Sequence, residues 1–106
     1  MSNTSRVEKS TKEDQIKDLY KTIPLIETSQ EAEDFLKALL SLNEIERAAR
    51  RWCCARKLMD GSVQRFTVEN CTASRNMVTK VNAAFIKNGN HIGKIVYDRF
   101  IECNND

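Results

Sequence analysis

The stretch that decides the expected fold is residues 60–81, which read DGSVQRFTVENCTASRNMVTKV. Gly61 stands where the end of a helix favours a residue in the left-handed conformation. Beyond it, the pattern predicts a short helix over residues 63–70, a turn of three or four small or polar residues, and a second helix over residues 74–87. Two helices joined in this way are typical of a helix-turn-helix, whose second helix can lie in the major groove of DNA.

The second of these helices carries side chains that suit contact with DNA. Val78 and Val81 are spaced to anchor it to a core, so its polar residues should point outward. Arginine can pair with guanine and asparagine with adenine, while threonine and lysine can meet phosphates or base edges. The expected DNA-contacting residues are Gln64, Arg65, Ser74, Arg75, Asn76, Thr79 and Lys80. Spacing alone leaves DNA binding and a merely structural helix pair equally open.

Three further helices are expected upstream. From residue 11 apolar residues recur at helical spacing, with Ile16, Leu19 and Tyr20 on one face, and this helix should end before Pro24. Capping boxes at residues 28–31 and 41–44 begin the next two helices, because each pairs a hydroxyl with a glutamate three residues later. The third helix should run to about residue 60. Its expected inward residues are Leu42, Ile45, Ala48, Ala49, Trp52, Ala55 and either Leu58 or Met59, and its expected outward residues are Arg47, Arg50, Arg51, Arg56 and Lys57.

The end of the chain and its composition complete an all-α expectation. After a break at residues 88–90, a last helix near residues 91–103 places Ile92, Ile95, Val96 and Phe100 on one stripe. Three glycines and one proline leave little material for hairpins, so we expect about six helices and no strand. Residues 1–10 should form a flexible polar tail and residues 11–106 one domain. The apolar stripes of the first three helices exceed what a monomer of this length could cover, which predicts a homodimer.

Charge is distributed unevenly along the chain. Residues 1–46 hold six Lys/Arg and ten Asp/Glu, whereas residues 47–94 hold ten Lys/Arg against only Asp60 and Glu69. A basic block of this size in a folded region is typical of a protein that binds a polyanion such as double-stranded DNA. A solvated basic face without a partner is the alternative.

Other classes of protein are poorly supported by the sequence. No stretch approaches the roughly 18 apolar residues of a membrane span, and the polar N-terminus has no apolar signal segment, so we expect a cytoplasmic protein with reduced cysteines. Cys53 and Cys54 are adjacent on a predicted helix, and Cys71 and Cys103 are isolated in the sequence, so core packing is expected in place of a metal site. His91 has no nucleophile or carboxylate at a recognisable spacing. We therefore expect neither enzyme activity nor a cofactor.

Several segments resemble the Trp-repressor-like family, and its YerC/YecD group in particular. They are SLNEI at 41–45, ARRW at 49–52, ARKLMDG at 55–61, TAS at 72–74 and VTKV at 78–81. The resemblance covers about residues 14–99. It implies an all-helical fold, an interlocked homodimer and operator binding through the helix-turn-helix, hence a bacterial transcriptional regulator and most simply a repressor.

The chain also departs from that family. Relatives usually have glycine at the position of Thr72, and commonly Thr and Ile at those of Met77 and Val78. The first helix of the pair is irregular too, because Phe66 and Val68 do not share one clean face. These departures leave open a helical protein-interaction module whose helix-turn-helix has decayed. A replication-initiator-type domain shares the helix arrangement, but this chain has no ATPase module.

The resemblance also makes Arg51 a candidate ligand-binding residue. In the family's repressor, an arginine of the third helix and one of the recognition helix hold tryptophan. Arg51 matches the first, but Lys80 stands at the second, followed by Val81 in place of glycine, and Ala84 replaces a serine. Lysine lacks the planar, stacking guanidinium, so a tryptophan corepressor is not expected. An ion pair or a phosphate contact is the preferred interpretation of Arg51.

Overall fold

The computed structural model describes residues 9–88 and 91–104, and these residues form helices joined by short turns. The α-helices are α1 (Lys12–Thr22), α2 (Ser29–Leu39), α3 (Leu42–Met59), α4 (Gln64–Asn70), α5 (Arg75–Asn82) and α6 (His91–Cys103), with a 3-10 turn at Ile23–Leu25 and a π-helical turn at Ala83–Lys87. The described residues contain no strand, which confirms the all-α expectation. The expected tail lies mostly outside the described residues, as do positions 89 and 90 of the expected break.

The chain divides into two compact units, one ending at Leu40 and one beginning at Ser41. In the first unit, α1 begins where Thr11 Oγ1 accepts the Asp14 N–H at 3.1 Å, and it ends ahead of the proline as predicted. None of the residues in α1 or α2 is buried. The apolar face of α1 therefore stays open to solvent within this unit, with Leu19 and Tyr20 exposed.

The capping box predicted at the start of α2 is only half present. Thr28 Oγ1 accepts the Glu31 N–H at 3.0 Å, as expected. The Glu31 carboxylate, however, accepts the N–H of Glu27 at 2.9 Å, one residue ahead of the cap. The carboxylate still satisfies a free backbone donor, so the helix start is stabilised without the reciprocal bond.

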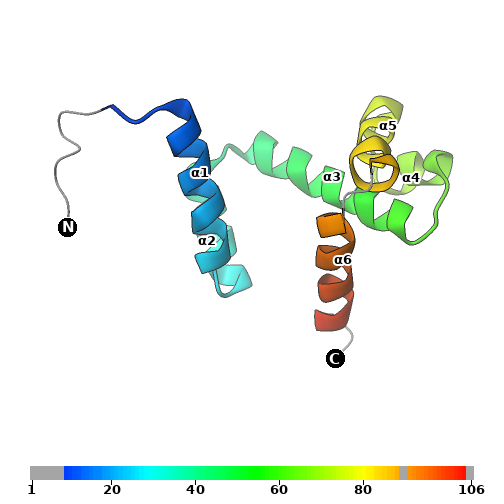
Figure 1. The fold of residues 1–106 in the computed structure, drawn as a ribbon. Helices are drawn as coiled ribbons and strands as arrows, with labels where there is room; N and C mark the ends of the chain where they lie inside the picture. The colour runs from blue at the N-terminus through cyan, green and yellow to red at the C-terminus, as the bar shows by residue number, and fades with distance from the viewer. Residues whose placement is uncertain (1–8, 89–90, 105–106) are drawn as a thin grey trace. The chain divides into compact units, whose positions relative to one another are not determined.

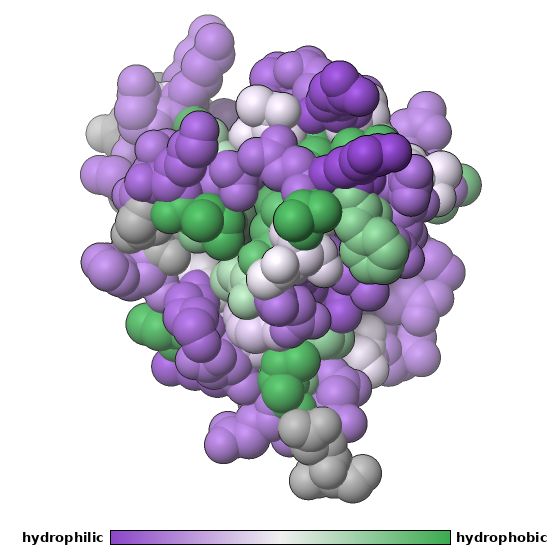
Figure 2. All heavy atoms as spheres, turned by 90° about the vertical axis from the view of Figure 1, so that its right-hand side faces the viewer, coloured by the Kyte–Doolittle hydropathy of each residue, from purple (hydrophilic) through white to green (hydrophobic). Residues whose placement is uncertain are grey.

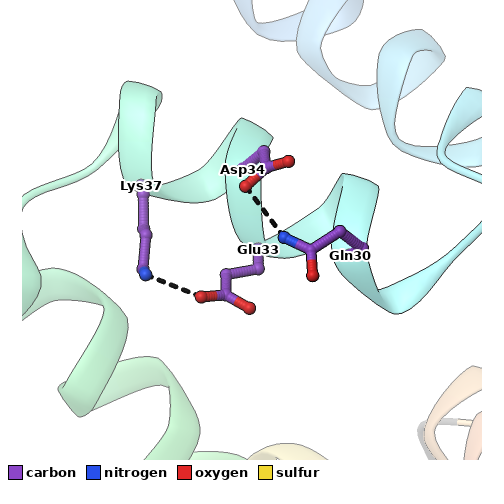
Figure 3. Close-up of polar contacts among 4 residues, drawn as sticks. All are labelled: Gln30, Glu33, Asp34 and Lys37. Atoms are coloured by element: carbon purple, nitrogen blue, oxygen red, sulfur yellow. Dashed lines mark hydrogen bonds and ion pairs between the residues drawn. The ribbon is translucent and has the colours of Figure 1, made fainter.

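α2 carries two exposed polar pairs, and in each pair the two residues are four positions, about one helical turn, apart (Figure 3). Lys37 Nζ lies 2.6 Å from Glu33 Oε2, and Gln30 Nε2 donates to Asp34 Oδ1 at 3.1 Å. The ion pair lowers the pKa of Glu33 and raises that of Lys37. Because both pairs are solvated, each contributes little to helix stability.

The second unit begins with α3, whose two ends follow the sequence closely. Ser41 Oγ accepts the Glu44 N–H at 3.2 Å and the Glu44 carboxylate accepts the Ser41 N–H at 2.7 Å, so this capping box is complete. These bonds lower the pKa of Glu44. At the other end Gly61 has φ +95°, and the N–H groups of Gly61 and Ser62 donate to carbonyl oxygens of the last turn, both at 3.0 Å. This is the left-handed helix end that the glycine predicts.

The core of the second unit lies against the C-terminal half of α3, where α4, α5 and α6 pack (Figure 1). Its buried apolar residues are Cys54, Ala55, Leu58, Cys71, Ala73, Val78 and Val81, with Trp52, Met59, Val68 and Phe85 partly buried beside them. The prediction that Leu42, Ala48 and Ala49 point inward is wrong, since all three are exposed. These three residues lie in the N-terminal half of α3, whereas α4, α5 and α6 pack against its C-terminal half.

An aromatic cluster joins α3 to the C-terminal elements. Trp52 lies 6.3 Å from Phe85 of the π turn and 6.2 Å from Phe100 of α6, measured between ring centroids. The Arg56 guanidinium lies 4.9 Å from the centroid of Phe100. The predicted helix 74–87 is therefore interrupted: α5 ends at Asn82, and the wider π turn that follows carries Phe85 into this cluster.

The face of α6 that packs differs from its most apolar stripe. Gly93 and Tyr97 are buried, whereas Ile92 and Ile95 are exposed. A Cβ placed on Gly93 would lie 2.5 Å from the Phe85 ring, so the absence of a side chain permits this close approach. Tyr97 donates a hydrogen bond to the Asp60 carboxylate at the end of α3, and that bond raises the pKa of Tyr97.

The turn between α4 and α5 holds a β-branched residue in a costly conformation. Thr72 has φ +52°, which places it in the left-handed region that glycine tolerates best. We expect Thr72→Gly to raise the free energy of unfolding by about 1 kcal/mol and the melting temperature by about 5 °C. Thr72→Ala is the matched control, because alanine keeps a Cβ. Thermal unfolding that shows no gain for glycine over alanine would contradict a strained turn.

Candidate nucleic-acid interface

The orientation of α4 is set by a polar residue. Thr67 is fully buried, and its Oγ1 donates to the Val63 carbonyl at 3.0 Å, so its polar atom is satisfied inside the helix. Val68 is partly buried beside the core, while Phe66 is 52 % exposed. The irregular apolar pattern of this helix follows, because Thr67 takes the inward position that Phe66 would occupy in a regular amphipathic helix.

The turn at residues 71–74 fixes where α5 begins. Cys71 and Ala73 are buried, and the Ala73 N–H donates to the Val68 carbonyl at 3.2 Å. Ser74 Oγ accepts the Met77 N–H at 3.0 Å and so caps α5. The Ser74 oxygen, one of the expected DNA contacts, therefore has a structural role in the free protein.

The two faces of α5 are as different as the sequence predicts. Val78 and Val81 are both 1 % exposed and hold the helix against the core. The seven residues expected to contact DNA are all exposed: Gln64, Arg65, Ser74, Arg75, Asn76, Thr79 and Lys80. A helix anchored by one face thus presents four polar side chains on the other.

A pocket of about 450 Å³ lies between α4 and the first turn of α5. It brings together three of the expected residues, Gln64, Arg65 and Arg75, whereas the other expected residues of α5 are not part of its lining. Glu69 also lines it and was not among the residues predicted for the site. Its position four residues after Arg65 on one helix face is the signal that could have included it.

The cations of this surface are available to an external anion. Within the part of the chain that the structure describes, Arg65, Arg75 and Lys80 lie in no ion pair, whereas Lys94 pairs with Asp98 at 2.7 Å. Figure 2 views the side on which α4 and α5 lie in Figure 1, and it shows a mainly hydrophilic surface with separate apolar patches. An unpaired basic surface of this kind suits phosphate contacts.

Arg51 lies elsewhere. It is exposed on α3 and lines a shallow hollow of about 270 Å³ with four other residues of that helix: Asn43, Glu44, Arg47 and Ala48. None of these residues lines the pocket between α4 and α5. Among the described residues Arg51 has no ion-pair partner. Of the two roles expected from the sequence, the ion pair is therefore not seen and the phosphate contact stays a prediction.

The cysteines are arranged differently from the sequence-based expectation. Cys71 is not isolated, because the turn after α4 returns to α3 and brings Cys71 Sγ to 2.9 Å from Cys53 Sγ. Over residues 9–88 and 91–104, no group of three or more potential ligands is placed to hold a metal ion. The same residues include no helix with both the length and the apolar character needed to cross a membrane.

Comparison of the chain with protein-family models, curated proteins and solved structures gives no match. The resemblance to Trp-repressor-like proteins stays a prediction from the sequence segments that carry it. Function is inferred from the geometry and charge of α4 and α5.

Proposed function

We propose that this chain is a sequence-specific DNA-binding regulator in which α4 and α5 act as a helix-turn-helix. The observation that carries the proposal is the anchoring of α5: Val78 and Val81 are buried while Arg75 and Asn76 stand exposed in its first turn. A helix about 10–12 Å across with its side chains fits the roughly 12 Å major groove. Residues of the first turn of such a helix reach base edges.

The surrounding charge supports a polyanionic ligand. Residues 47–94 carry ten Lys/Arg and two Asp/Glu, and of these two acids Asp60 accepts a hydrogen bond from Tyr97. Arg65 from α4 and Lys80 from α5 flank the proposed base-reading residues on the chain and are exposed. They are suited to phosphates, which position a protein on DNA without reading its sequence.

Phosphate contacts make a prediction about salt. Arg65→Ala and Lys80→Ala should weaken binding to all DNA sequences alike and lower the slope of log affinity against log salt by about one unit each. Glu69→Gln, which removes the carboxylate from the pocket, should strengthen binding. Lys94→Ala removes a lysine already paired with Asp98 and is the control. Fluorescence anisotropy with a labelled duplex over a salt series measures these slopes, and equal slopes for all four variants would contradict the assignment.

The proposed regulator is a homodimer. Large apolar side chains are exposed in both units, among them Leu19 and Leu25 in the first and Ile95 in the second. Exposed apolar side chains such as these could be covered by a second copy of the chain. A two-fold dimer would also present two copies of α5 to successive turns of DNA.

Dimerisation is tested by mass in solution. At micromolar concentration, sedimentation equilibrium should give twice the 12.2 kDa of the chain. Ile16→Glu should shift the protein toward monomer, because it places a charge on the exposed apolar face of α1. Gln15→Glu adds the same charge about 100° around the helix and should leave the dimer intact. A wild type that sediments only at the monomer mass would overturn this part of the proposal.

A second candidate function is a helical protein-interaction module. Phe66 is 52 % exposed on α4, and Glu69 places a carboxylate beside the two arginines of the pocket. Exposed aromatic residues are enriched at protein interfaces, and a carboxylate opposes phosphate binding. This candidate predicts a protein partner for α4 and no steep salt dependence on DNA.

A further inference from the structure

A pair of thiols lies at the junction of α3 with the turn before α5. Cys53 of α3 and Cys71, the residue that ends α4, are both free thiols with their sulfur atoms 2.9 Å apart. A disulfide bond is about 2.05 Å long, so the two sulfur atoms need to move only about 1 Å closer to bond. Cys71 lies 18 residues after Cys53 in the sequence, which makes this a tertiary contact and not a local one.

We propose that Cys53 and Cys71 form a redox-active pair, which a hydroperoxide converts into an intrachain disulfide between α3 and the turn at residues 71–74. The pair does not depend on DNA binding. The disulfide fastens the turn at residues 71–74 to α3. This turn contains Thr72 and leads directly into α5.

The two cysteines have different roles because their environments differ. Cys53 is partly exposed and can be reached by a small oxidant, whereas Cys71 is buried. Burial raises the pKa of Cys71 to about 12, so Cys71 is a thiol at neutral pH. Because an oxidant can reach Cys53 and not Cys71, Cys53 reacts first and Cys71 resolves the product.

The atoms of this reaction balance. The Cys53 thiol loses its proton, its sulfur attacks one peroxide oxygen, an S–O bond forms, and the O–O bond breaks. The leaving hydroxide, or the alkoxide of an organic hydroperoxide, takes up the proton that Cys53 lost and departs as water or an alcohol. The Cys71 sulfur then attacks the sulfenic acid sulfur of Cys53, the S–S bond forms, and the S–O bond breaks to release a second water that carries the Cys71 proton. Two thiols lose two electrons and the hydroperoxide gains them.

The other cysteines are poor alternatives. Cys54 also interacts with Cys71, but it is fully buried, which keeps an oxidant away from it. Cys53 and Cys54 are consecutive in α3 and point about 100° apart, so a bond between them would break the helix. Cys103 is exposed at the end of α6 and lies outside the core cluster that contains the buried cysteines, Cys54 and Cys71.

Mass spectrometry of the full, reduced chain tests the proposal. Hydrogen peroxide at neutral pH should lower the intact mass by about 2 Da, and a thiol reductant should restore it. Trypsin should then yield a linked pair of peptides, residues 52–56 and 66–75, and fragmentation should place the bond at Cys53. Cys53→Ser and Cys71→Ser should abolish the mass decrease, while Cys54→Ala and Cys103→Ser should keep it.

Two results would overturn the proposal. One is a wild-type protein that only gains oxygen under peroxide and never loses 2 Da. The other is a mass decrease that persists in Cys53→Ser, which would assign the bond to a different cysteine. Because peptide mapping is carried out on the wild type, the outcome does not depend on whether each variant folds.

Discussion

Trp52→Ala should lower the free energy of unfolding by about 3 kcal/mol. Trp52 lies 6.3 Å from Phe85 and 6.2 Å from Phe100 between ring centroids, so it joins α3 to both C-terminal elements of its unit. Its loss leaves a cavity that two aromatic rings cannot fill. Since Trp52 is only partly buried, the expected cost is at the lower end of the range for tryptophan truncations. Urea unfolding followed by circular dichroism measures it.

Trp52→Phe is the matched control for this cluster. It keeps an aromatic ring against both neighbours and should lose roughly 1 kcal/mol, mainly through the smaller buried area. If alanine and phenylalanine cost the same, the aromatic contacts contribute little and the packing of α6 must rest elsewhere. The midpoint of the urea unfolding curve should fall while the slope of unfolding free energy against urea concentration stays the same, because the substitution affects a single core.

Arg75→Ala and Asn76→Ala should each cost about 1–3 kcal/mol on the preferred DNA site and relax base preference at one position of that site. Both residues are exposed in the first turn of α5, where side chains of a recognition helix reach base edges. Neither substitution should change the melting temperature much, since neither side chain is packed. Titrations of each variant against the preferred site and against single base-pair substitutions measure the effect.

Arg47→Ala is the control for charge. Arg47 is exposed on α3, so Arg47→Ala removes one positive charge, as Arg75→Ala does, but removes no proposed base contact. The ratio of the affinity for the preferred site to the affinity for a substituted site measures base recognition, and this ratio should be unchanged for Arg47→Ala. An unchanged ratio for Arg75→Ala and Asn76→Ala as well would remove both residues from base recognition.

Helix ends were the most predictable part of the fold, because their signals are local. Ser41 with Glu44 predicts the start of α3, and Gly61 predicts its left-handed end, since each depends only on hydrogen bonds within a few residues. The half-formed box at Thr28 shows the limit of such signals. There the carboxylate of Glu31 accepts the N–H of Glu27 and not the N–H of Thr28, which the capping box would require.

Which residues are buried was less predictable, because burial depends on distant segments. Leu42 and Ala48 share the helical spacing of Ala55, yet only Ala55 lies where α5 packs and is buried. Apolar periodicity identifies which face of a helix points inward. It does not show how far along the helix other elements pack against that face. The contact of Cys53 with Cys71 has the same origin, since no spacing rule relates two residues that a turn brings together.

The sequence predicted that the residues of the candidate site are exposed. It did not predict every residue that lines the pocket. All seven expected residues are exposed, and those of α5 are exposed because Val78 and Val81 fix its inward face. The sequence did not reveal that Glu69 shares a pocket with Arg65 and Arg75, because that pocket exists only once α4 and α5 are packed.

Selection from a randomised double-stranded DNA library with the wild-type protein tests the central proposal most directly. The proposal predicts an enriched site made of two related half-sites, about 10 base pairs apart from centre to centre, which binds at least 10³-fold more tightly than unselected DNA at the same salt concentration. A library that shows no enriched sequence, with affinity no higher than that for unselected DNA, would contradict sequence-specific binding by α5 and leave the protein-interaction module as the function to test.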